Sequence, residues 1–267
     1  MEKKSKSIAI IGGGNLGAAI AEGLIKSKFI TPGQLYVTRR NTDPLKHLKD
    51  LGVNVTSNNA EAIQKSEVVI VALKPYNVKE VMGALKKEIS SKQILISVIT
   101  GVDLEELNSI FGERNPVFRA MPNTAIAIQQ SVTCLCHCGA SDSQVSYVTD
   151  LFDNLGITVP IDEKLMDAAT VLGACGTAYA MRYIRANIQG GIEIGFDAAT
   201  ASLIAAQTVK GAAQLLLEKG SHPEQEIDKV TTPKGCTIAG LNEMEHQGFS
   251  SSLIRGLVAS YNKILKG

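Results

Sequence analysis

The chain has 267 residues, of which 45% are hydrophobic and 20% charged, a composition typical of a globular protein with a large core. Its formal net charge of +1 gives no electrostatic reason to expect a nucleic acid or an anionic membrane as a partner. No apolar stretch is as long as a membrane span, no signal peptide is evident, and the five cysteines form an odd number, so we expect reduced thiols in a cytoplasmic protein.

A glycine-rich motif lies near the N-terminus. Residues 8–11 form a short apolar run of the kind found in buried parallel strands, and residues 18–28 have the pattern of a helix. Between them, Gly12, Gly14 and Gly17 have the spacing G-x-G-x-x-G. The first glycine permits a tight turn, the second lets backbone amides approach a pyrophosphate, and the third lets the helix pack closely on the strand. In this context the motif predicts a dinucleotide-binding site, with an ordinary glycine-rich turn as the alternative.

The end of the second expected strand, residues 34–38, bears on the choice of cofactor. Folds of this kind that bind NAD carry an acidic residue there, which binds the ribose 2′-hydroxyl. This chain has Arg39 and Arg40 instead, with no carboxylate at the strand end. Guanidinium groups suit a 2′-phosphate through charge-assisted, bidentate hydrogen bonds, and solvated loop charges are the alternative. We therefore predict NADPH as the cofactor and leave NADH open.

Strands and helices alternate through the rest of the first half of the chain. Further strands are expected at 53–56, 67–73, 93–99, 115–120, 131–138 and 156–160, with helices at 77–88, 103–111 and 141–154. This alternation predicts a parallel sheet with crossover helices, which makes residues 1–161 a first domain. Ligands of such sheets bind beyond the carboxyl ends of the strands, so the strand ends at 73–75, 100–101 and 121–124 are candidate contacts for nicotinamide and substrate.

Three cysteines alternate along one expected strand, at positions 134, 136 and 138, with His137 between the last two. The paired C-x-x-C spacing of many metal sites is absent. Alternation along a strand places the three thiols on one face, where cysteine behaves as a small apolar side chain. We therefore expect no metal site.

From residue 162 the strand pattern gives way to alanine-rich, amphipathic stretches. We expect helices at 164–191, 197–220, 223–230, 236–247 and 250–266, so that residues 162–267 form an all-helical second domain. The first of these helices contains Gly173 and Gly176, and glycine is costly inside a helix. A neighbouring helix or a partner subunit is therefore expected to approach the backbone there.

Residues 231–237 form a polar turn that opens one of these helices. Exposed amides at a helix N-terminus attract anions, so the turn can hold a substrate carboxylate, with the Thr237 hydroxyl as a further donor. From local sequence, an N-capped helix without a ligand is an equal alternative.

Taken together, these motifs resemble the Δ1-pyrroline-5-carboxylate reductase family, which carries out the last step of proline biosynthesis. The resemblance covers essentially the whole chain. Its most specific part is Val-Thr-Thr-Pro-Lys-Gly-Cys-Thr-Ile-Ala-Gly-Leu at 230–241, which is similar to the family's signature loop and following helix. The other matching segments are the Ile-Gly-Gly-Gly-Asn-Leu-Gly motif at 11–17, Ala-Leu-Lys-Pro at 72–75, Met-Pro-Asn-Thr at 121–124 and Gly-Gly-Ile-Glu-Ile-Gly at 190–195.

The resemblance implies an α/β Rossmann-type parallel sheet domain followed by an all-α helical dimerisation domain. It also implies a homodimer, with a higher oligomer left open, and a small-molecule substrate bound at the junction of the domains. By position, the cofactor contacts would be Gly12, Gly14, Asn15, Leu16, Arg39, Arg40, Asn59, Leu73, Lys74 and Pro75. The substrate contacts would be Met121, Asn123, Gly235, Cys236 and Thr237, with the carboxylate on the amides around Gly235.

The chain departs from the family pattern at several positions. Lys234 stands where the family commonly has the first of two glycines. Cys175 and Thr177 replace the serine and proline of Ser-Gly-Pro-Ala-Tyr. An acidic residue is usual near Gln189, and a proline usually follows Met-Pro-Asn-Thr, where this chain has Ala125. None of these changes removes a donor that the reaction requires, but they leave the preference among cyclic imines open.

The resemblance implies reduction of Δ1-pyrroline-5-carboxylate to L-proline, with hydride transfer from NADPH to C5 of the ring. Thr237 would be the catalytic group, donating a hydrogen bond to the ring nitrogen or relaying a proton to it. A reductase of a related cyclic imine is an alternative. A β-hydroxyacid dehydrogenase is disfavoured, because those enzymes use a lysine in the first helix of the second domain and residues 165–209 contain none. A non-catalytic NADP-binding regulatory protein is disfavoured, because it would lose the substrate anchor and segment 231–241 is intact.

Overall fold

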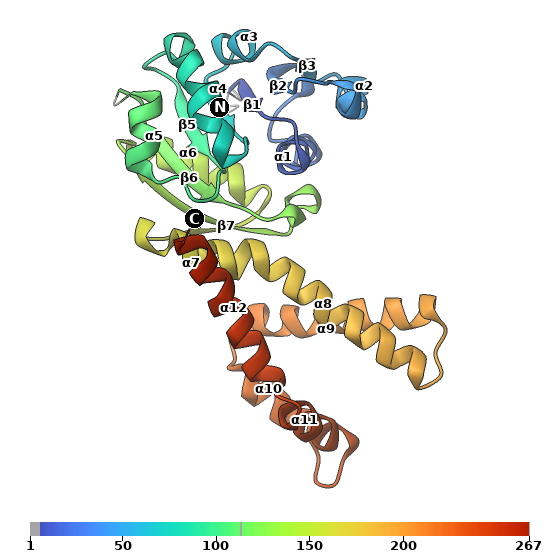
Figure 1. Ribbon diagram of the computed structural model, residues 1–267. Helices are drawn as coiled ribbons and strands as arrows, with labels where there is room; N and C mark the ends of the chain where they lie inside the picture. The colour runs from blue at the N-terminus through green and yellow to red at the C-terminus, as the bar shows by residue number, and fades with distance from the viewer. Residues whose placement is uncertain (1–5, 113, 267) are drawn as a thin grey trace. The chain divides into compact units, whose positions relative to one another are not determined.

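The computed structural model describes residues 6–112 and 114–266, which divide into two compact units (Figure 1). The first unit extends to Ala174 and includes the last residues of the chain from Ile264. The second unit comprises Cys175–Lys263. The functional boundary expected after residue 161 stays a prediction.

An eight-stranded sheet forms the centre of the first unit, in the order β3-β2-β1-β4-β5-β6-β7-β8. The strands are β1 (Ile8–Ile11), β2 (Leu35–Thr38), β3 (Asn54–Thr56), β4 (Val68–Val71), β5 (Ile94–Ser97), β6 (Val117–Met121), β7 (Ser131–Cys138) and β8 (Gly156–Pro160). All neighbours are parallel except β6 and β7, which pair antiparallel with Phe118 opposite His137. A parallel connection needs a crossover of about a dozen residues or more, and the link 122–130 is too short for one. The expected parallel sheet is therefore confirmed with one reversed pair.

Helices cover both faces of this sheet (Figure 1). They are α1 (Asn15–Lys26), α2 (Lys46–Asp50), α3 (Asn59–Gln64), α4 (Pro75–Leu85), α5 (Leu104–Phe111), α6 (Asp142–Asp153) and α7 (Met166–Ala169). Side chains of α1, α2 and α6 pack in one core with Ile8 and Ile10 of β1. Those of α3, α4 and α5 pack in a second core with Ala9 and Ile11. The alternation along β1 explains its continuous apolar sequence, because both faces of the strand are buried.

Two helices begin earlier than the sequence suggested. Helix α1 begins at Asn15, inside the glycine motif, and not at residue 18. Helix α4 begins at Pro75 and not at residue 77, because proline lacks only an amide that is unpaired anyway in the first helical turn. The short helices α2 and α3 were not expected.

The second unit is all-helical, as expected. It contains α8 (Gly176–Glu193), α9 (Ala198–Lys219), α10 (Pro223–Lys229), α11 (Cys236–His246) and most of α12 (Phe249–Leu265). A Cβ on Gly191 of α8 would lie 3.1 Å from the Cβ of Ala201 on α9, so these helices approach closely. The rings of Tyr183 and Phe249 join α8 to α12 at 6.0 Å between centroids. Among the helices of residues 6–112 and 114–266, none is long and apolar enough to cross a membrane.

The long helix expected at 164–191 is interrupted. A π-helical turn, Thr170–Cys175, separates α7 from α8. Asn123 donates from Nδ2 to the carbonyl oxygen of Gly173 in this turn at 3.2 Å. Val132 of β7 would lie 3.5 Å from a Cβ at position 173. The groups that approach Gly173 thus come from a loop and a strand, not from a neighbouring helix.

Candidate cofactor and substrate sites

The glycine loop between β1 and α1 has room for a side chain at only one of its three motif positions. Gly12 has a φ of +111°, and a Cβ there would overlap the carbonyl oxygen of Ala72. A Cβ on Gly17 would overlap the carbonyl oxygen of Gly12, so α1 packs directly on the loop. A Cβ on Gly14 would have no heavy atom within 4 Å. The outer face of the middle glycine is therefore open to a ligand, as a pyrophosphate requires.

The N-terminus of α1 is free to receive an anion. Its N-cap residue is Gly14, with no side-chain cap and no acidic residue in the first turn. The loop before it is fastened to the end of β2, because Gly13 N donates to Thr38 O at 2.6 Å and Gly12 N donates to Thr38 Oγ1 at 3.3 Å. A fixed loop and uncapped helical amides together form an anion site.

The two arginines after β2 are held differently. Arg39 donates from Nη1 to the carbonyl oxygen of Gly13 at 3.0 Å, and its amide donates to Thr56 O at 3.1 Å. The Arg40 side chain makes no hydrogen bond or ion pair with the described residues on either side of position 113. Both side chains are exposed, but Arg39 is bonded to the loop, whereas Arg40 is available to a 2′-phosphate.

A cleft of about 310 Å³ connects these groups. Six of the expected cofactor residues line it, namely Gly12, Gly14, Arg39, Arg40, Asn59 and Leu73. Asn15, Leu16, Lys74 and Pro75 are not in its lining, although Lys74 and Pro75 begin helix α4 at its edge of the sheet. The sequence reading missed Ser57 and Asn77, which the rule on strand carboxyl ends could have found because they follow β3 and β4. The assignment of cofactor contacts stays a prediction.

Asn123 is largely committed to contacts within the first unit. Its Oδ1 accepts from Ala125 N at 3.0 Å, its Nδ2 donates to Gly173 O, and its own amide donates to Ser131 Oγ at 3.1 Å. One N–H and one lone pair of the side chain remain for a ligand. Met121, at the end of β6, is buried, with its sulfur 4.0 Å from Thr100 Oγ1. Their expected roles in substrate binding stay predictions.

The signature turn in the second unit explains the family's glycine at the position of Lys234. This residue has a φ of +61°, in the left-handed region that favours glycine. Gly235 follows with an extended backbone, and a Cβ there would overlap the Thr232 hydroxyl. The chain therefore keeps the turn's shape with a lysine at one position, and at the next position glycine avoids a close contact with Thr232.

Helix α11 begins directly after this turn with an open N-terminus. Gly235 is its N-cap residue, no side chain caps it, and its first turn has no acidic residue. Thr237 is exposed, and its hydroxyl makes no hydrogen bond within the part of the chain that the structure describes. These amides and this hydroxyl have the chemistry that a carboxylate and a ring nitrogen need, and their roles stay predictions.

The alternating cysteines of β7 serve as apolar side chains at two of three positions. Cys136 is buried and Cys134 packs against the same core, while Cys138 is exposed. Burial, with a smaller contribution from the Glu163 carboxylate, raises the pKa of the Cys136 thiol to about 11. Among the described residues, no group of three or more His, Cys, Asp and Glu side chains is placed to hold a metal.

A buried ion pair fastens the segment before α7 to the sheet. The Arg119 side chain on β6 is only 6% exposed, and its Nη1 lies 2.8 Å from Glu163 Oε1. The same oxygen accepts from Leu104 N at 2.7 Å, at the start of α5. Asp167 lies 3.9 Å from Arg119 Nη2. Glu163 therefore holds both a strand and a helix end.

Comparison with known proteins agrees with this geometry. Family models match residues 7–101 (NADP oxidoreductase coenzyme F420-dependent) and residues 163–266 (pyrroline-5-carboxylate reductase dimerisation). Pyrroline-5-carboxylate reductase 2 of Dictyostelium discoideum is 41% identical over 280 residues, which cover 99% of this chain and 94% of that protein. Pyrroline-5-carboxylate reductase 1 of the same organism is 44% identical over 275 residues, which cover 98% of this chain but 50% of that relative, so the chain spans about half of its length.

The fold agrees as well. The crystal structure of Plasmodium falciparum pyrroline carboxylate reductase with NADP bound matches with a TM-score of 0.90 at 25% identity, covering 98% of this chain and 97% of that chain. A relative with 41% identity and coverage of nearly both full chains is decisive. The chain therefore belongs to the pyrroline-5-carboxylate reductase family.

Proposed function

We propose that this chain reduces Δ1-pyrroline-5-carboxylate to L-proline with NADPH, the last step of proline biosynthesis. The observation that carries the proposal is the open N-terminus of α11 in the signature segment. There the uncapped amides lie beside the Thr237 hydroxyl, which makes no hydrogen bond with the described residues. The oxidoreductase activity agrees with the names of the curated relatives, which are pyrroline-5-carboxylate reductases.

The first unit fits NADPH. When bound, the cofactor supplies the hydride that reduces the C=N bond. The amides at the start of α1 would hold the pyrophosphate over the open face of Gly14. Arg40 would pair with the 2′-phosphate, since it has no partner among the described residues, and Leu73 would close the cleft near Gly12.

The second unit supplies the substrate groups. The amides of Cys236 and Thr237 would donate hydrogen bonds to the substrate carboxylate, which needs no cationic side chain because the helix N-terminus itself carries partial positive charge. The Thr237 hydroxyl would donate to the ring nitrogen and orient the C=N bond. The nitrogen gains one proton in the reaction, from water or by relay through this hydroxyl.

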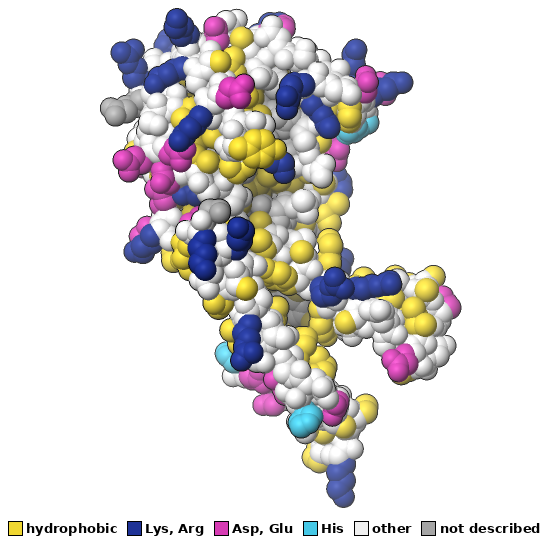
Figure 2. Space-filling view, viewed as in Figure 1, with side chains coloured by type: hydrophobic (Ala, Val, Ile, Leu, Met, Phe, Trp, Pro, Cys, Tyr) yellow, Lys and Arg dark blue, Asp and Glu magenta, His cyan; other side chains and the backbone are white. Residues whose placement is uncertain are grey.

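We propose that the chain forms a homodimer through its helical unit and acts in the cytoplasm. Figure 2 shows hydrophobic side chains at the surface of the helices of this unit. Large exposed ones among them are Leu203 at 72%, Leu217 at 69% and Ile194 at 79%. Of the described residues between Cys175 and Lys263, only Ala201 and Ala205 are buried. Such a surface needs a partner, and a second copy agrees with the match to a dimerisation family over residues 163–266.

The test is oxidation of NADPH, and separately of NADH, followed at 340 nm with Δ1-pyrroline-5-carboxylate. We expect turnover with NADPH, a large loss in Thr237→Ala, and retention of most activity in Thr237→Ser, which keeps the hydroxyl. Wild-type turnover of Thr237→Ala across pH would refute the role of that hydroxyl. A folded chain that binds NADP⁺ and turns over neither cofactor would refute the proposed reaction and favour another cyclic imine or a regulatory protein.

A further inference from the structure

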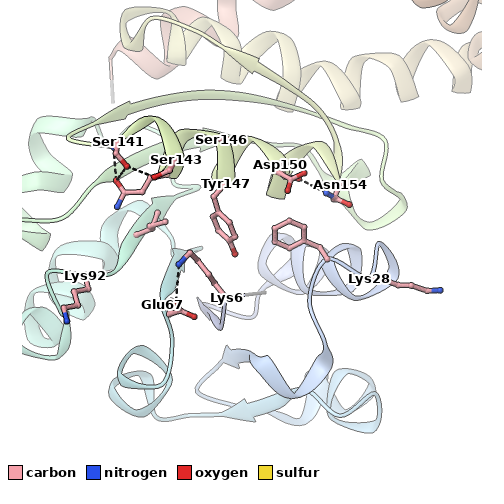
Figure 3. Close-up of a pocket in the computed structure, with 13 residues that line it drawn as sticks. Lys6, Lys28, Glu67, Lys92, Ser141, Ser143, Ser146, Tyr147, Asp150 and Asn154 are labelled. Carbon is pink, nitrogen blue, oxygen red and sulfur yellow. Dashed lines mark hydrogen bonds and ion pairs between the residues drawn. The ribbon is translucent and has the colours of Figure 1, made fainter. Parts of the chain in front are cut away.

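A second cavity lies at the opposite edge of the sheet from the glycine loop. Its lining comes from the amino ends of β1, β4 and β5, from α6 and from the segment after α1, and its volume is about 820 Å³ (Figure 3). No residue lines both this cavity and the cofactor cleft. A volume of this size is typical of small-molecule sites. The proposed reaction makes no use of it.

Aromatic and aliphatic side chains form its inner wall. Tyr147 points from α6 into the cavity toward Lys6 (Figure 3). The ring of Phe29 lies 5.8 Å from the Tyr147 ring between centroids, at 55° between planes. Ile94 at the start of β5 is buried beside them. This wall suits the flat or apolar body of a small ligand.

The hydroxyl of Tyr147 has no partner among the residues that the structure describes. Its oxygen is buried from solvent and makes no hydrogen bond within residues 6–112 and 114–266. Burial, with a smaller contribution from the Glu67 and Asp150 carboxylates, raises the pKa of this phenol, so it stays protonated and can donate. A buried hydroxyl without an acceptor is costly to the fold, so it is a candidate for contact with a ligand.

A replaceable ion pair lies next to this hydroxyl. Lys6 Nζ is 5.8 Å from the centre of the Tyr147 ring and 3.1 Å from Glu67 Oε1 (Figure 3). The Glu67 side chain is 56% exposed, and its other oxygen, Oε2, accepts from Ser7 N at 3.3 Å. Both contacts are exposed, so the carboxylate can turn to water at little cost. A ligand carboxylate can therefore take its place on Lys6.

The rim of the cavity carries excess positive charge. Lys28 and Lys92 lie on opposite sides of it (Figure 3), and neither ammonium forms an ion pair with the described residues. With Lys6, the lining holds three lysines against the two carboxylates of Glu67 and Asp150. This balance favours an anionic ligand over a cationic one.

We propose that this cavity binds a small organic acid with a ring, whose carboxylate accepts hydrogen bonds from Tyr147 Oη and Lys6 Nζ. The ring packs on Phe29, and Glu67 turns to solvent. Binding is reversible and needs no chemical step. The proposal is independent of the reductase reaction, since neither Tyr147 nor Lys6 belongs to the cofactor or substrate groups.

The test is isothermal titration calorimetry of the full chain with benzoate as the probe, in saturating NADP⁺. We expect saturable binding in the millimolar range, the affinity of a small fragment, and a loss of at least tenfold in Tyr147→Phe. Tyr36→Phe is the matched control, because Lys65 Nζ lies 6.0 Å from the centre of that ring, outside the cavity. Benzyl alcohol, which has the ring without the charge, and acetate, which has the charge without the ring, should both bind at least tenfold more weakly than benzoate.

Three results would overturn the proposal. The first is the absence of saturable benzoate binding, the second is an equal affinity in wild type, Tyr147→Phe and Lys6→Met, and the third is binding of benzoate at the substrate site. Tyr147→Phe removes an unpartnered group, so its thermal midpoint should not fall, and an intact midpoint separates lost binding from lost folding. Benzoate that binds at the substrate site instead would lose affinity in Thr237→Ala and keep it in Tyr147→Phe, which also overturns the proposal.

Discussion

Arg39 and Arg40 are adjacent in sequence but differently held, so their replacement should have different consequences. Arg39 is bonded to the carbonyl oxygen of Gly13 at 3.0 Å and stabilises the loop that either cofactor would use. Arg40 has no such contact within the described chain and lines the cleft. Arg40→Gln should therefore weaken NADPH alone, because only NADPH has a 2′-phosphate. Arg39→Gln should weaken NADPH and NADH together.

The magnitudes follow from the hydrogen bonds lost. A hydrogen bond to a charged group is worth about 1.5–3 kcal/mol, or roughly a 10- to 150-fold change in affinity. Both arginines are exposed, and solvent screening selects the lower end of this range. We expect Arg40→Gln to raise the Kd of NADPH about tenfold and leave that of NADH unchanged. Loss of the bond from Arg39 to Gly13 should raise the Kd of NADH by roughly two- to tenfold.

Fluorescence titration with each cofactor measures these constants, and initial rates at 340 nm give the matching KM values. Lys46→Gln is the control for a general loss of positive charge, because Lys46 is exposed on α2 and does not line the cleft. If the ratio of the Kd of NADPH to that of NADH changed equally in Arg40→Gln and Lys46→Gln, the role of Arg40 would be refuted. An NADH affinity that is unchanged in Arg39→Gln would show that the bond to Gly13 does not shape the loop.

Three further predictions concern stability and reactivity, with unfolding measured in urea at fixed protein concentration. Lys234→Gly should raise the free energy of unfolding by about 0.5–1 kcal/mol. The left-handed backbone costs a lysine about 1–2 kcal/mol, and the greater freedom of glycine in the unfolded chain offsets only part of this. A lower unfolding midpoint would show that Lys234 is not strained. Glu163→Gln should lower the free energy of unfolding by about 1–3 kcal/mol. This is less than the full cost of breaking a buried ion pair, because the Glu163 side chain is 33% exposed. An unchanged unfolding midpoint would show that Arg119 needs no charged partner. Maleimide at pH 8 should modify the exposed Cys138 and spare Cys136, whose pKa is raised to about 11 by burial, and peptide mass spectrometry that finds both labelled at equal rates would refute the burial.

The sheet and the glycine loop could be predicted because their signals are local. The apolar run of β1 and the three motif glycines report a strand, a turn and a helix within ten residues of one another. The reversal of β7 and the π-helical turn depend on features that local periodicity does not report. The reversal follows from the short link between β6 and β7. The π-helical turn is fastened by a hydrogen bond from Asn123, 50 residues away along the chain, and such a contact leaves no periodic trace in the sequence.

The sequence predicted which residue types form the candidate site better than it predicted the role of each residue. Both arginines could be named from the strand end. The sequence could not show that Gly13 accepts a hydrogen bond from Arg39, or that the Arg40 side chain has no partner among the described residues. Lys234 is a different case. Its left-handed backbone is the physical reason for the glycine that the family commonly has there, and the departure became interpretable only with the φ angle.

The helical unit has a consequence for how the protein is made. Ordering a backbone costs about 1–2 kcal/mol per residue. Among the described residues of this unit, only Ala201 and Ala205 are fully buried, so a single copy has little fully buried apolar surface to offset that cost. In the proposed homodimer, the fold of this half would therefore arise in an encounter between two chains and disappear on dilution. A newly synthesised chain would have its sheet half formed and its signature turn unformed until it met a second chain. The cellular concentration of the protein would then set the fraction of chains that are competent for catalysis.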